Sequence, residues 1–313
     1  MGKKKAAYKI GSDVLDPWRD DLLVGKPPVL YPIGEGEMAT IEVGPGRVNL
    51  IGGAPGAGKT AFTMQATLDA LRLTKTLRVV VCNVEMTPET LLDRQLARLS
   101  GVDLTTIRYR KLGREHADRI DQGLSTLATV ADRLCFLRPP FDLSNVAAAA
   151  DEFEADLLLL DYIQRIPPPG RHENRRGLVD ATMNYLRQFA DTGVAVVVVA
   201  AVARTKDKRG RSSYDGDGLN LASFRESSEL EFGADDAFIL VPNANPKSEQ
   251  VWLKHLKARY GETRDILFNF DRPRQYFQAQ SFTVNRSIGR GYPTLAASWD
   301  ETALAPGGNG DGE

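Results

Sequence analysis

One stretch decides the fold of this chain: Gly53-Ala54-Pro55-Gly56-Ala57-Gly58-Lys59-Thr60, which fits the pattern G-x-x-x-x-G-K-[ST] at every defined position. It follows a short apolar run at 48–51 and precedes an amphipathic stretch at 59–73. Glycines let successive backbone N–H groups point at one anion, and the helix that follows adds the positive end of its dipole. The pattern predicts a strand, a phosphate-binding loop and a helix; a flexible glycine-rich turn before a helix is the weaker alternative.

This loop predicts ATP as the ligand and Mg²⁺ as its metal ion. Lys59 is expected to reach the β- and γ-phosphates, and the Thr60 hydroxyl is expected to coordinate Mg²⁺. The predicted nucleotide-binding residues of the loop are Gly53, Ala54, Pro55, Gly56, Ala57, Gly58, Lys59, Thr60 and Ala61.

Two acidic residues follow apolar runs elsewhere in the chain. Asp161 closes the run 157–160, and Glu85 comes three residues after the run 77–82. Open α/β sheets bind ligands at the carboxyl ends of their strands, so both carboxylates are expected near the phosphate loop. Hydrolysis of ATP needs a group that holds Mg²⁺, and Asp161 is the predicted metal ligand. The alternative for either residue is a solvated acid at the end of a strand.

Short apolar runs alternate with longer amphipathic stretches from residue 48 onward. The runs are continuous, as in strands buried on both faces of a parallel sheet, and lie at 48–51, 77–82, 134–137, 157–160 and 194–199. Helices are predicted between them at 59–73, 88–99, 114–131, 143–151 and 174–191. Runs at 236–242, 250–257 and 265–270 predict antiparallel strands at the C-terminal edge. The predicted fold class is α/β, a doubly wound, mainly parallel sheet with helices on both faces.

The two ends of the chain lack this rhythm. Residues 1–30 predict an extended arm with one short helix near 18–23. The last residues of 281–313 are rich in glycine and poor in apolar side chains, which predicts a largely disordered tail. The predicted ATPase domain spans 31–280.

Composition indicates a cytoplasmic protein without a strong overall charge. Forty basic and 41 acidic residues give a formal net charge of -1, so a nucleic acid must be held by local basic loops. Cys82 and Cys135 lie in apolar runs and are predicted to be free thiols. No run of about 18 apolar residues occurs, which predicts a protein without a membrane partner.

Several further boxes resemble the motor domain of DnaB-type replicative helicases, which is a RecA-like P-loop domain. The first is Asn83-Val84-Glu85-Met86-Thr87-Pro88-Glu89, where the family has a Ser-Leu-Glu-Met-like box, and it is followed by matches at 94–97 and 100–103. Three more follow in the family's order: Leu160-Asp161-Tyr162-Ile163-Gln164, Phe224-Arg225-Glu226-Ser227-Ser228 and Lys257-Ala258-Arg259-Tyr260-Gly261. Together the matches span residues 47–278.

The resemblance implies roles that spacing alone leaves open. Glu85 would polarise the attacking water, and Arg94 would lie against the adenine. Arg259, with Lys257, would enter the neighbouring subunit's site as an arginine finger, a group worth ~10³–10⁵-fold in other P-loop enzymes. The alternative for these two is an exposed basic strand edge. A homo-oligomer, a hexameric ring in the family, is also implied, with a loader or other replication protein as a further partner.

Single-stranded DNA is the nucleic acid that the resemblance implies. Arg225 and Glu226 match the residues with which the family holds the DNA backbone, and Ser228 lies beside them. The preceding stretch 204–211 holds five basic residues and one acid. Its basic residues, predicted to follow DNA phosphates, are Arg204, Lys206, Lys208, Arg209 and Arg211. A solvated surface loop is the alternative for this stretch.

The chain departs from the family pattern at three points. Only residues 1–47 precede the first predicted core strand, so the family's helical N-terminal domain is not expected here. Ala201 stands where the family usually has a Gln that senses the γ-phosphate, and Ser228 stands where it has a Gly. These departures leave the coupling of hydrolysis to movement open.

Two functions of different classes follow. The leading hypothesis is a ring-forming, ATP-driven helicase or translocase on single-stranded DNA, serving the replication of a phage, plasmid or other mobile element. The alternative is an ATP-switched protein that oligomerises on DNA or on a partner without unwinding, as recombinase-like and clock-type relatives do. A small-molecule phosphotransferase is a weaker third hypothesis, because the sequence has no arginine-rich segment that resembles a lid.

Overall fold

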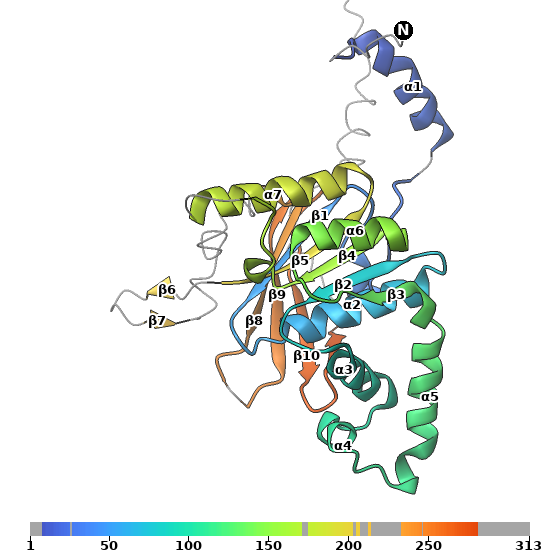
Figure 1. Ribbon diagram of the computed structural model, residues 1–313, viewed down its shortest axis with the longest axis vertical. Coiled ribbons are helices and arrows are strands. Elements are labelled where there is room, and N and C mark those ends of the chain that lie inside the picture. The colour runs from blue at the N-terminus through green and yellow to red at the C-terminus, as the bar shows by residue number, and fades with distance from the viewer. Residues whose placement is uncertain are drawn as a thin grey trace, which may run out of the picture. The chain divides into compact units, whose positions relative to one another are not determined.

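A single nine-stranded sheet organises the residues that the computed structural model describes, which are 8–25, 27–170, 175–202, 205–206, 212–213, 233–245 and 247–280. The strand order is β11-β10-β9-β8-β1-β5-β4-β2-β3 (Figure 1). The strands are β1 Val48–Gly53, β2 Val79–Asn83, β3 Leu134–Phe136, β4 Leu157–Asp161, β5 Ala195–Ala201, β8 Asp236–Pro242, β9 Gln250–Ala258, β10 Ile266–Asp271 and β11 Tyr276–Ala279.

Strand direction divides the sheet into two parts. β1, β2, β3, β4, β5 and β8 run parallel, whereas β9, β10 and β11 add antiparallel strands beyond β8. The predicted α/β class and its antiparallel C-terminal edge are confirmed. β11 was not predicted. The bounds of β8 match the predicted run, and the other observed strands differ from theirs by one or two residues at their ends. Because the register pairs Asn83 with Asp161 and Gly53 with Ala201, the carboxyl ends of β1, β2, β4 and β5 meet at one edge.

Seven α-helices lie wholly within the described residues. They are α1 Gly11–Val24, α2 Lys59–Leu73, α3 Pro88–Ser100, α4 Leu104–Arg108, α5 Ala117–Ala128, α6 Leu143–Phe153 and α7 Arg175–Asp191. The bounds predicted for α2 match the structure. The single helix predicted at 114–131 is instead a 3-10 turn at Arg114–His116 followed by α5, and α4 was not predicted.

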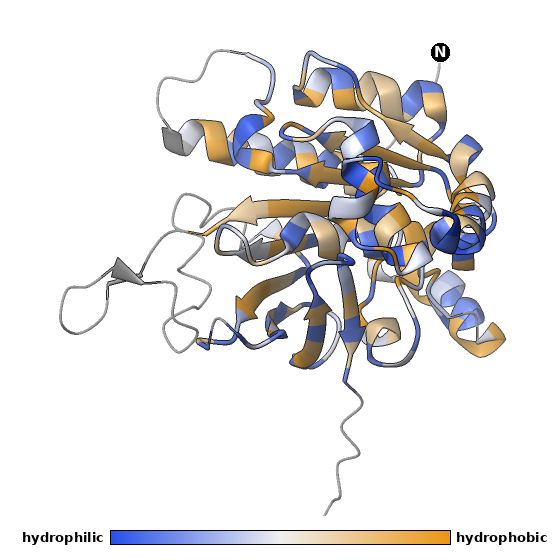
Figure 2. Ribbon diagram, turned by 90° about the horizontal axis from the view of Figure 1, so that it is seen from below, coloured by the Kyte–Doolittle hydropathy of each residue, from blue (hydrophilic) through white to orange (hydrophobic). Residues whose placement is uncertain are grey.

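Helices cover both faces of the parallel strands (Figures 1 and 2). On one face, Phe62 and Leu68 of α2 pack with side chains such as Val79 and Leu159. On the other face, α6 and α7 pack against the side chains that alternate with these, among them Val80. Burial of each such aliphatic side chain contributes about 1.5–3 kcal/mol, so this two-sided burial explains why the strand sequences are continuously apolar.

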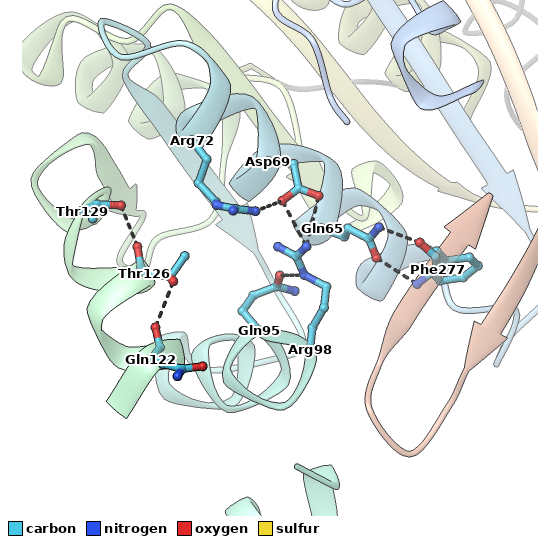
Figure 3. Close-up of polar contacts among 9 residues, drawn as sticks. All are labelled: Gln65, Asp69, Arg72, Gln95, Arg98, Gln122, Thr126, Thr129 and Phe277. Atoms are coloured by element: carbon cyan, nitrogen blue, oxygen red, sulfur yellow. Dashed lines mark hydrogen bonds and ion pairs between the residues drawn. The ribbon is translucent and has the colours of Figure 1, made fainter. Parts of the chain in front are cut away.

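Buried polar contacts fix the helix that follows the phosphate loop. Gln65 of α2 donates through Nε2 to the Phe277 carbonyl at 2.8 Å and accepts the Phe277 N–H at 2.9 Å, which ties α2 to β11 (Figure 3). On the neighbouring side, both Asp69 carboxylate oxygens accept hydrogen bonds from Nη1 of the buried Arg98 in α3, at 3.0 and 3.1 Å. These contacts hold α2 between the last strand of the sheet and α3.

Helix α1 is longer than the predicted short helix at 18–23, since it spans Gly11–Val24 and includes Pro17. None of its side chains is buried. Val14, Trp18 and Leu22 recur at a spacing of four residues and form an exposed apolar stripe. Among the described residues, no helix combines the length and apolar character that a crossing of the bilayer requires. The division of the chain into an arm at 1–30, a domain at 31–280 and a tail stays a prediction, and 281–313 lie outside the described residues.

Candidate nucleotide-binding site

The phosphate loop joins β1 to α2 in the predicted way, and two of its glycines have conformations that favour glycine. Gly56 has φ +77° and Gly58 has φ +94°. A Cβ atom at Gly58 would also lie 2.8 Å from the rings of Phe270 and Phe277. The rings of Phe270 in β10 and Phe277 in β11 therefore lie so close to the loop backbone that only glycine fits at position 58.

Lys59 lies at the start of α2, and its side chain points back along the loop. Its Nζ donates to the carbonyl oxygens of Gly53 at 2.8 Å and Ala54 at 3.0 Å. Burial lowers the pKa of Lys59, while the negative charges of Asp161 and Glu85 act in the opposite direction. The ammonium group is thus held where the loop, the helix and both predicted carboxylates meet.

Asp161 ends β4 beneath the phosphate loop and is 5% exposed. Its Oδ2 accepts hydrogen bonds from Thr60 Oγ1 at 2.6 Å and from Asn83 Nδ2 at 2.9 Å. Burial raises the pKa of Asp161, against the opposing effects of the Thr60 hydrogen bond and the Lys59 charge. The structure brings the two predicted metal ligands, Thr60 and Asp161, into direct contact.

Glu85 lies in the turn that follows β2 and is exposed. Its backbone N–H donates to Asn83 Oδ1 at 3.0 Å, and that of Met86 donates to the same oxygen at 2.8 Å. Because β2 and β4 are neighbours, this turn begins beside the end of β4. Glu85 therefore shares a cavity with Asp161 and Lys59, as predicted from its place at the carboxyl edge.

One cavity of about 540 Å³ gathers these residues. Arg94 of α3 lines it and donates to Gln275 Oε1 at 3.1 Å, and burial lowers the pKa of Arg94. The lining residues are Pro55, Gly56, Gly58, Lys59, Thr60, Ala61, Glu85, Met86, Arg94, Asp161, Tyr162, Ala201, Phe270, Arg272 and Gln275. The volume falls in the range of about 300–1,000 Å³ that is typical of small-molecule sites.

Among the residues of this site that were not singled out from the sequence, three make side-chain hydrogen bonds there. Arg272 and Gln275 come from the turn between β10 and β11, and Arg272 Nη1 donates to the Gly56 carbonyl at 3.1 Å. Nothing in the sequence indicates that this turn reaches the phosphate loop. Asn83 is the third, and its position two residues before Glu85 in the helicase-like box was the available signal.

The donor set fits Mg²⁺ bound together with a triphosphate. Mg²⁺ favours oxygen ligands and is usually held by one or two protein groups, with waters and phosphate oxygens completing its shell. Thr60 and Asp161 supply one hydroxyl and one carboxylate at this point. Within the described parts of the chain, no group of three or more His, Cys, Asp or Glu side chains forms a metal cage. One hydroxyl and one carboxylate would leave the other positions of a Mg²⁺ shell to waters and phosphate oxygens.

Lys257 and Arg259 lie at the opposite end of the sheet from the phosphate loop. The Arg259 N–H donates to the Asp235 carbonyl at 2.9 Å, and the Asp235 N–H donates to the carbonyl of Val48, the first residue of β1. The phosphate loop begins after the last residue of β1, about 17 Å away at 3.3 Å per residue. The Arg259 side chain is 40% exposed and its Nη1 lies 2.8 Å from the buried Asp235 carboxylate. The two basic residues therefore do not meet the cavity of their own chain.

The predicted DNA-binding residues are mostly outside the described residues. These are Arg204, Lys208, Arg209, Arg211, Arg225, Glu226 and Ser228. The backbone of Lys206 is described in the short strand β6 Thr205–Lys206, which pairs antiparallel with β7 Ser212–Ser213. The roles of these residues stay predictions.

Ala201 ends β5 at the mouth of the cavity. Its N–H donates to Gln164 Oε1, and its carbonyl accepts from Gln164 Nε2, both at 3.2 Å. Gln164 lies just beyond the end of β4, in the 3-10 turn Ile163–Arg165. The carboxamide of Gln164 thus pairs with the β5 backbone where β4 itself has ended.

Sequence comparison finds similar chains among replicative DNA helicases. A probable plasmid replicative DNA helicase of Chlamydia trachomatis is 21% identical over 229 residues, which cover 72% of this chain and 49% of the relative. The replicative DNA helicase DnaB of Rickettsia conorii is 25% identical over 238 residues, covering 67% and 46% of the two chains. The chain thus spans about half the length of the curated relatives it matches.

Solved structures show the same fold. One solved ATPase domain superposes with a TM-score of 0.75 at 16% identity, covering 87% of this chain and 100% of that domain. A DnaB-like replicative helicase, solved in a study of its interactions with primase, superposes with a TM-score of 0.72 at 16% identity and covers 88% and 68%. The model of the DnaB-like helicase C-terminal domain matches residues 38–279, and this chain belongs to that family.

Proposed function

We propose that this chain hydrolyses ATP and uses the reaction to move along single-stranded DNA as part of a ring of identical subunits. One observation carries the proposal: Lys59, Thr60, Asp161 and Glu85 come from three separate places in the sequence and line one cavity. This combination supplies a phosphate-binding cation, two groups suited to a metal ion and a carboxylate for the attacking water.

Each side chain has a distinct part in the proposed hydrolysis. The loop N–H groups and Lys59 bind the phosphates, and Thr60 and Asp161 hold Mg²⁺, which neutralises charge on the phosphate oxygens when bound. Glu85 orients water from the turn after β2. Arg94, Gln275 and Arg272 border the rest of the cavity and bind the nucleoside end.

The placement of Arg259 supports a site shared between subunits. At the far end of its own sheet, Arg259 is suited to reach the nucleotide of a neighbour in a head-to-tail ring, in which each subunit offers one end to the next. Helix α1 offers a second contact, because its apolar stripe of Val14, Trp18 and Leu22 is exposed in the single chain. A ring of six copies, as in the resembled family, completes the proposal.

The proposed activity is tested by ATPase assays with and without single-stranded DNA, beside a strand-displacement assay. Lys59→Ala is expected to weaken ATP binding by about 2 kcal/mol, the strength of a hydrogen bond to a charged group, or ~30-fold. Single-stranded DNA is expected to stimulate hydrolysis by the wild-type protein only. Equal turnover by the wild-type and Lys59→Ala proteins would contradict the proposal that this site hydrolyses ATP.

A second candidate is an ATP-switched protein that assembles on DNA or on a partner without unwinding. The observation that favours it is Ala201, whose methyl group has no donor for a phosphate and whose N–H is bonded to Gln164. Exchange of ATP for ADP would then affect the residues after 201 only through the backbone, because the Ala201 side chain cannot contact a phosphate by a hydrogen bond. ATP-dependent assembly and DNA-stimulated hydrolysis without strand displacement would select this second function.

A further inference from the structure

Asn83 joins the two acidic residues of the cavity through one side chain. It is the last residue of β2 and is 8% exposed. Its Nδ2 donates to Asp161 Oδ2 at 2.9 Å, while its Oδ1 accepts the N–H groups of Glu85 at 3.0 Å and Met86 at 2.8 Å. A single carboxamide thus connects the end of β4 with the turn that carries Glu85.

The two ends of the carboxamide have different tasks. The donor end faces the Asp161 oxygen that also accepts the Thr60 hydroxyl at 2.6 Å. If the Thr60 oxygen turns to a metal ion, Asn83 still donates to Asp161 and keeps the carboxylate in place. The acceptor end takes two successive N–H groups, which fixes the direction in which the backbone leaves β2 and hence where Glu85 begins.

Few other side chains can do both tasks at this position. The family box has Ser here, and a hydroxyl has one proton on a shorter side chain than the carboxamide of Asn83. Aspartate would keep the acceptor end but would place a second negative charge against Asp161 in a buried site. The carboxamide is therefore matched to a neighbour that accepts and to a turn that donates.

We infer that Asn83 is a positioning residue that fixes Glu85 relative to Asp161 for the ATP hydrolysis proposed above, on which this inference rests. It touches neither phosphate nor water in this role. Its contribution is the geometry between the metal-binding carboxylate and the water-orienting carboxylate, which belong to neighbouring strands.

Two variants separate the two ends of the carboxamide. Asn83→Ala removes both, whereas Asn83→Asp removes only the donor to Asp161. The matched control is Asn49→Ala, since Asn49 is a 1% exposed strand asparagine that donates to the Glu42 carbonyl at 3.1 Å, away from the cavity. Thermal unfolding of every variant shows whether it folds.

The first measurement is hydrogen exchange at the Glu85 and Met86 amides of the full chain without nucleotide. Protection at these two amides is expected to fall in Asn83→Ala, but to persist in Asn83→Asp and Asn49→Ala. Unchanged protection in a folded Asn83→Ala protein would overturn the inference whatever the ATPase assay gives.

The second measurement is steady-state ATP hydrolysis against ATP and Mg²⁺ concentration. Asn83→Ala is expected to lower kcat by about 10²-fold, the cost of a displacement of about 1 Å at a reacting group, with KM for ATP within a few-fold of wild type. If the wild-type protein is active and Asn83→Ala has the same kcat, the inference about Asn83 is overturned, whereas the proposed ATPase function stands. Equal background rates in wild type and Lys59→Ala would overturn the proposed function and the inference with it.

Discussion

The Thr60 hydroxyl and the Asp161 carboxylate are hydrogen-bonded at 2.6 Å although the two residues are 101 positions apart in the chain. Asp161 is buried, and its pKa is raised chiefly for that reason. A raised pKa means that the folded protein holds the proton on this carboxyl more tightly than the unfolded chain does. The charge needed to hold a metal ion is therefore present at a cost to the stability of the nucleotide-free fold.

Asp161→Asn should stabilise the nucleotide-free protein at neutral pH and abolish Mg²⁺-dependent hydrolysis. The stability linked to the Asp161 proton is present below the unfolded pKa, near about 3.9, and is lost as pH rises through the raised folded pKa. At about pH 7.5 the Tm of the variant is expected to exceed that of wild type, because the amide places no buried charge at this position.

Thermal unfolding in the presence of a metal chelator, from about pH 7.5 down to about 4, measures this difference. The gap in Tm is expected to shrink as pH falls, because the wild-type carboxyl becomes protonated and neutral like the amide. A gap that is constant with pH, or a less stable variant at the upper end of this range, would contradict the argument.

Glu85→Gln should leave ATP bound and stop its hydrolysis. Glutamine keeps the size of the side chain and its hydrogen bonding to water but loses the negative charge that polarises the attacking water. We expect ATP affinity within a few-fold of wild type, measured with a fluorescent ATP analogue, and a fall in kcat of about 10²–10⁴-fold. Asp265→Asn serves as a control carboxylate, because Asp265, the residue before β10, pairs with Lys254 of β9 and does not line the cavity.

Arg259→Ala and Lys59→Ala should complement each other when the two impaired proteins are mixed. A mixed assembly contains some interfaces in which an intact phosphate loop of one subunit meets an intact Arg259 of the next. Random assembly at equal amounts makes about a quarter of the interfaces complete in a head-to-tail ring. Partial recovery of the ATPase rate is the expected result.

The matched control mixes Lys59→Ala with Glu85→Gln. Both changes lie on the loop side of one subunit's site, so no interface in that mixture is complete and no recovery is expected. Recovery in both mixtures, or in neither, would count against an Arg259 that acts between subunits.

Affinity for single-stranded DNA should fall steeply with salt if the basic stretch 204–211 follows phosphates. Counterion release gives a log–log slope of about -0.7 per phosphate contacted on single strands. Fluorescence anisotropy of a labelled oligonucleotide, titrated at salt concentrations between roughly 50 and 200 mM, gives the slope. Replacing Lys208 and Arg209 by Ala should reduce the slope by about 1.4. A flat response would reject this electrostatic contact.

The local parts of this site could be predicted from the sequence. The phosphate loop and the bounds of α2 depend on glycines, on Lys59 and on the spacing of apolar residues. These signals lie within a few residues of one another, so both features can be predicted from the local sequence. Asp161 was predictable for a similar reason, because a continuous apolar run that ends in an acid indicates a buried strand reaching a polar edge.

The remaining features depend on partners that are distant in the chain. Gln275 reaches the cavity because the turn between β10 and β11 lies beside the phosphate loop. Strand β11 has only 4 residues, too few for an alternation of apolar and polar side chains to predict it. Helix α1 extends through Pro17, which in a sequence indicates a break. The role of Asn83 follows from the register of β2 against β4, and a single sequence does not contain that register.

The contact of Gln65 with Phe277 has a consequence for how the protein is made. The two residues are 212 positions apart. At a synthesis rate of about 5–20 residues per second, roughly 10–40 s pass on the ribosome between them. During that interval the Gln65 side chain of α2 lacks both of its hydrogen-bond partners. Phe270 and Phe277, whose rings lie against Gly58, have not yet both been added to the chain. The nascent chain is therefore expected to acquire nucleotide-binding competence late, once β11 has emerged from the exit tunnel.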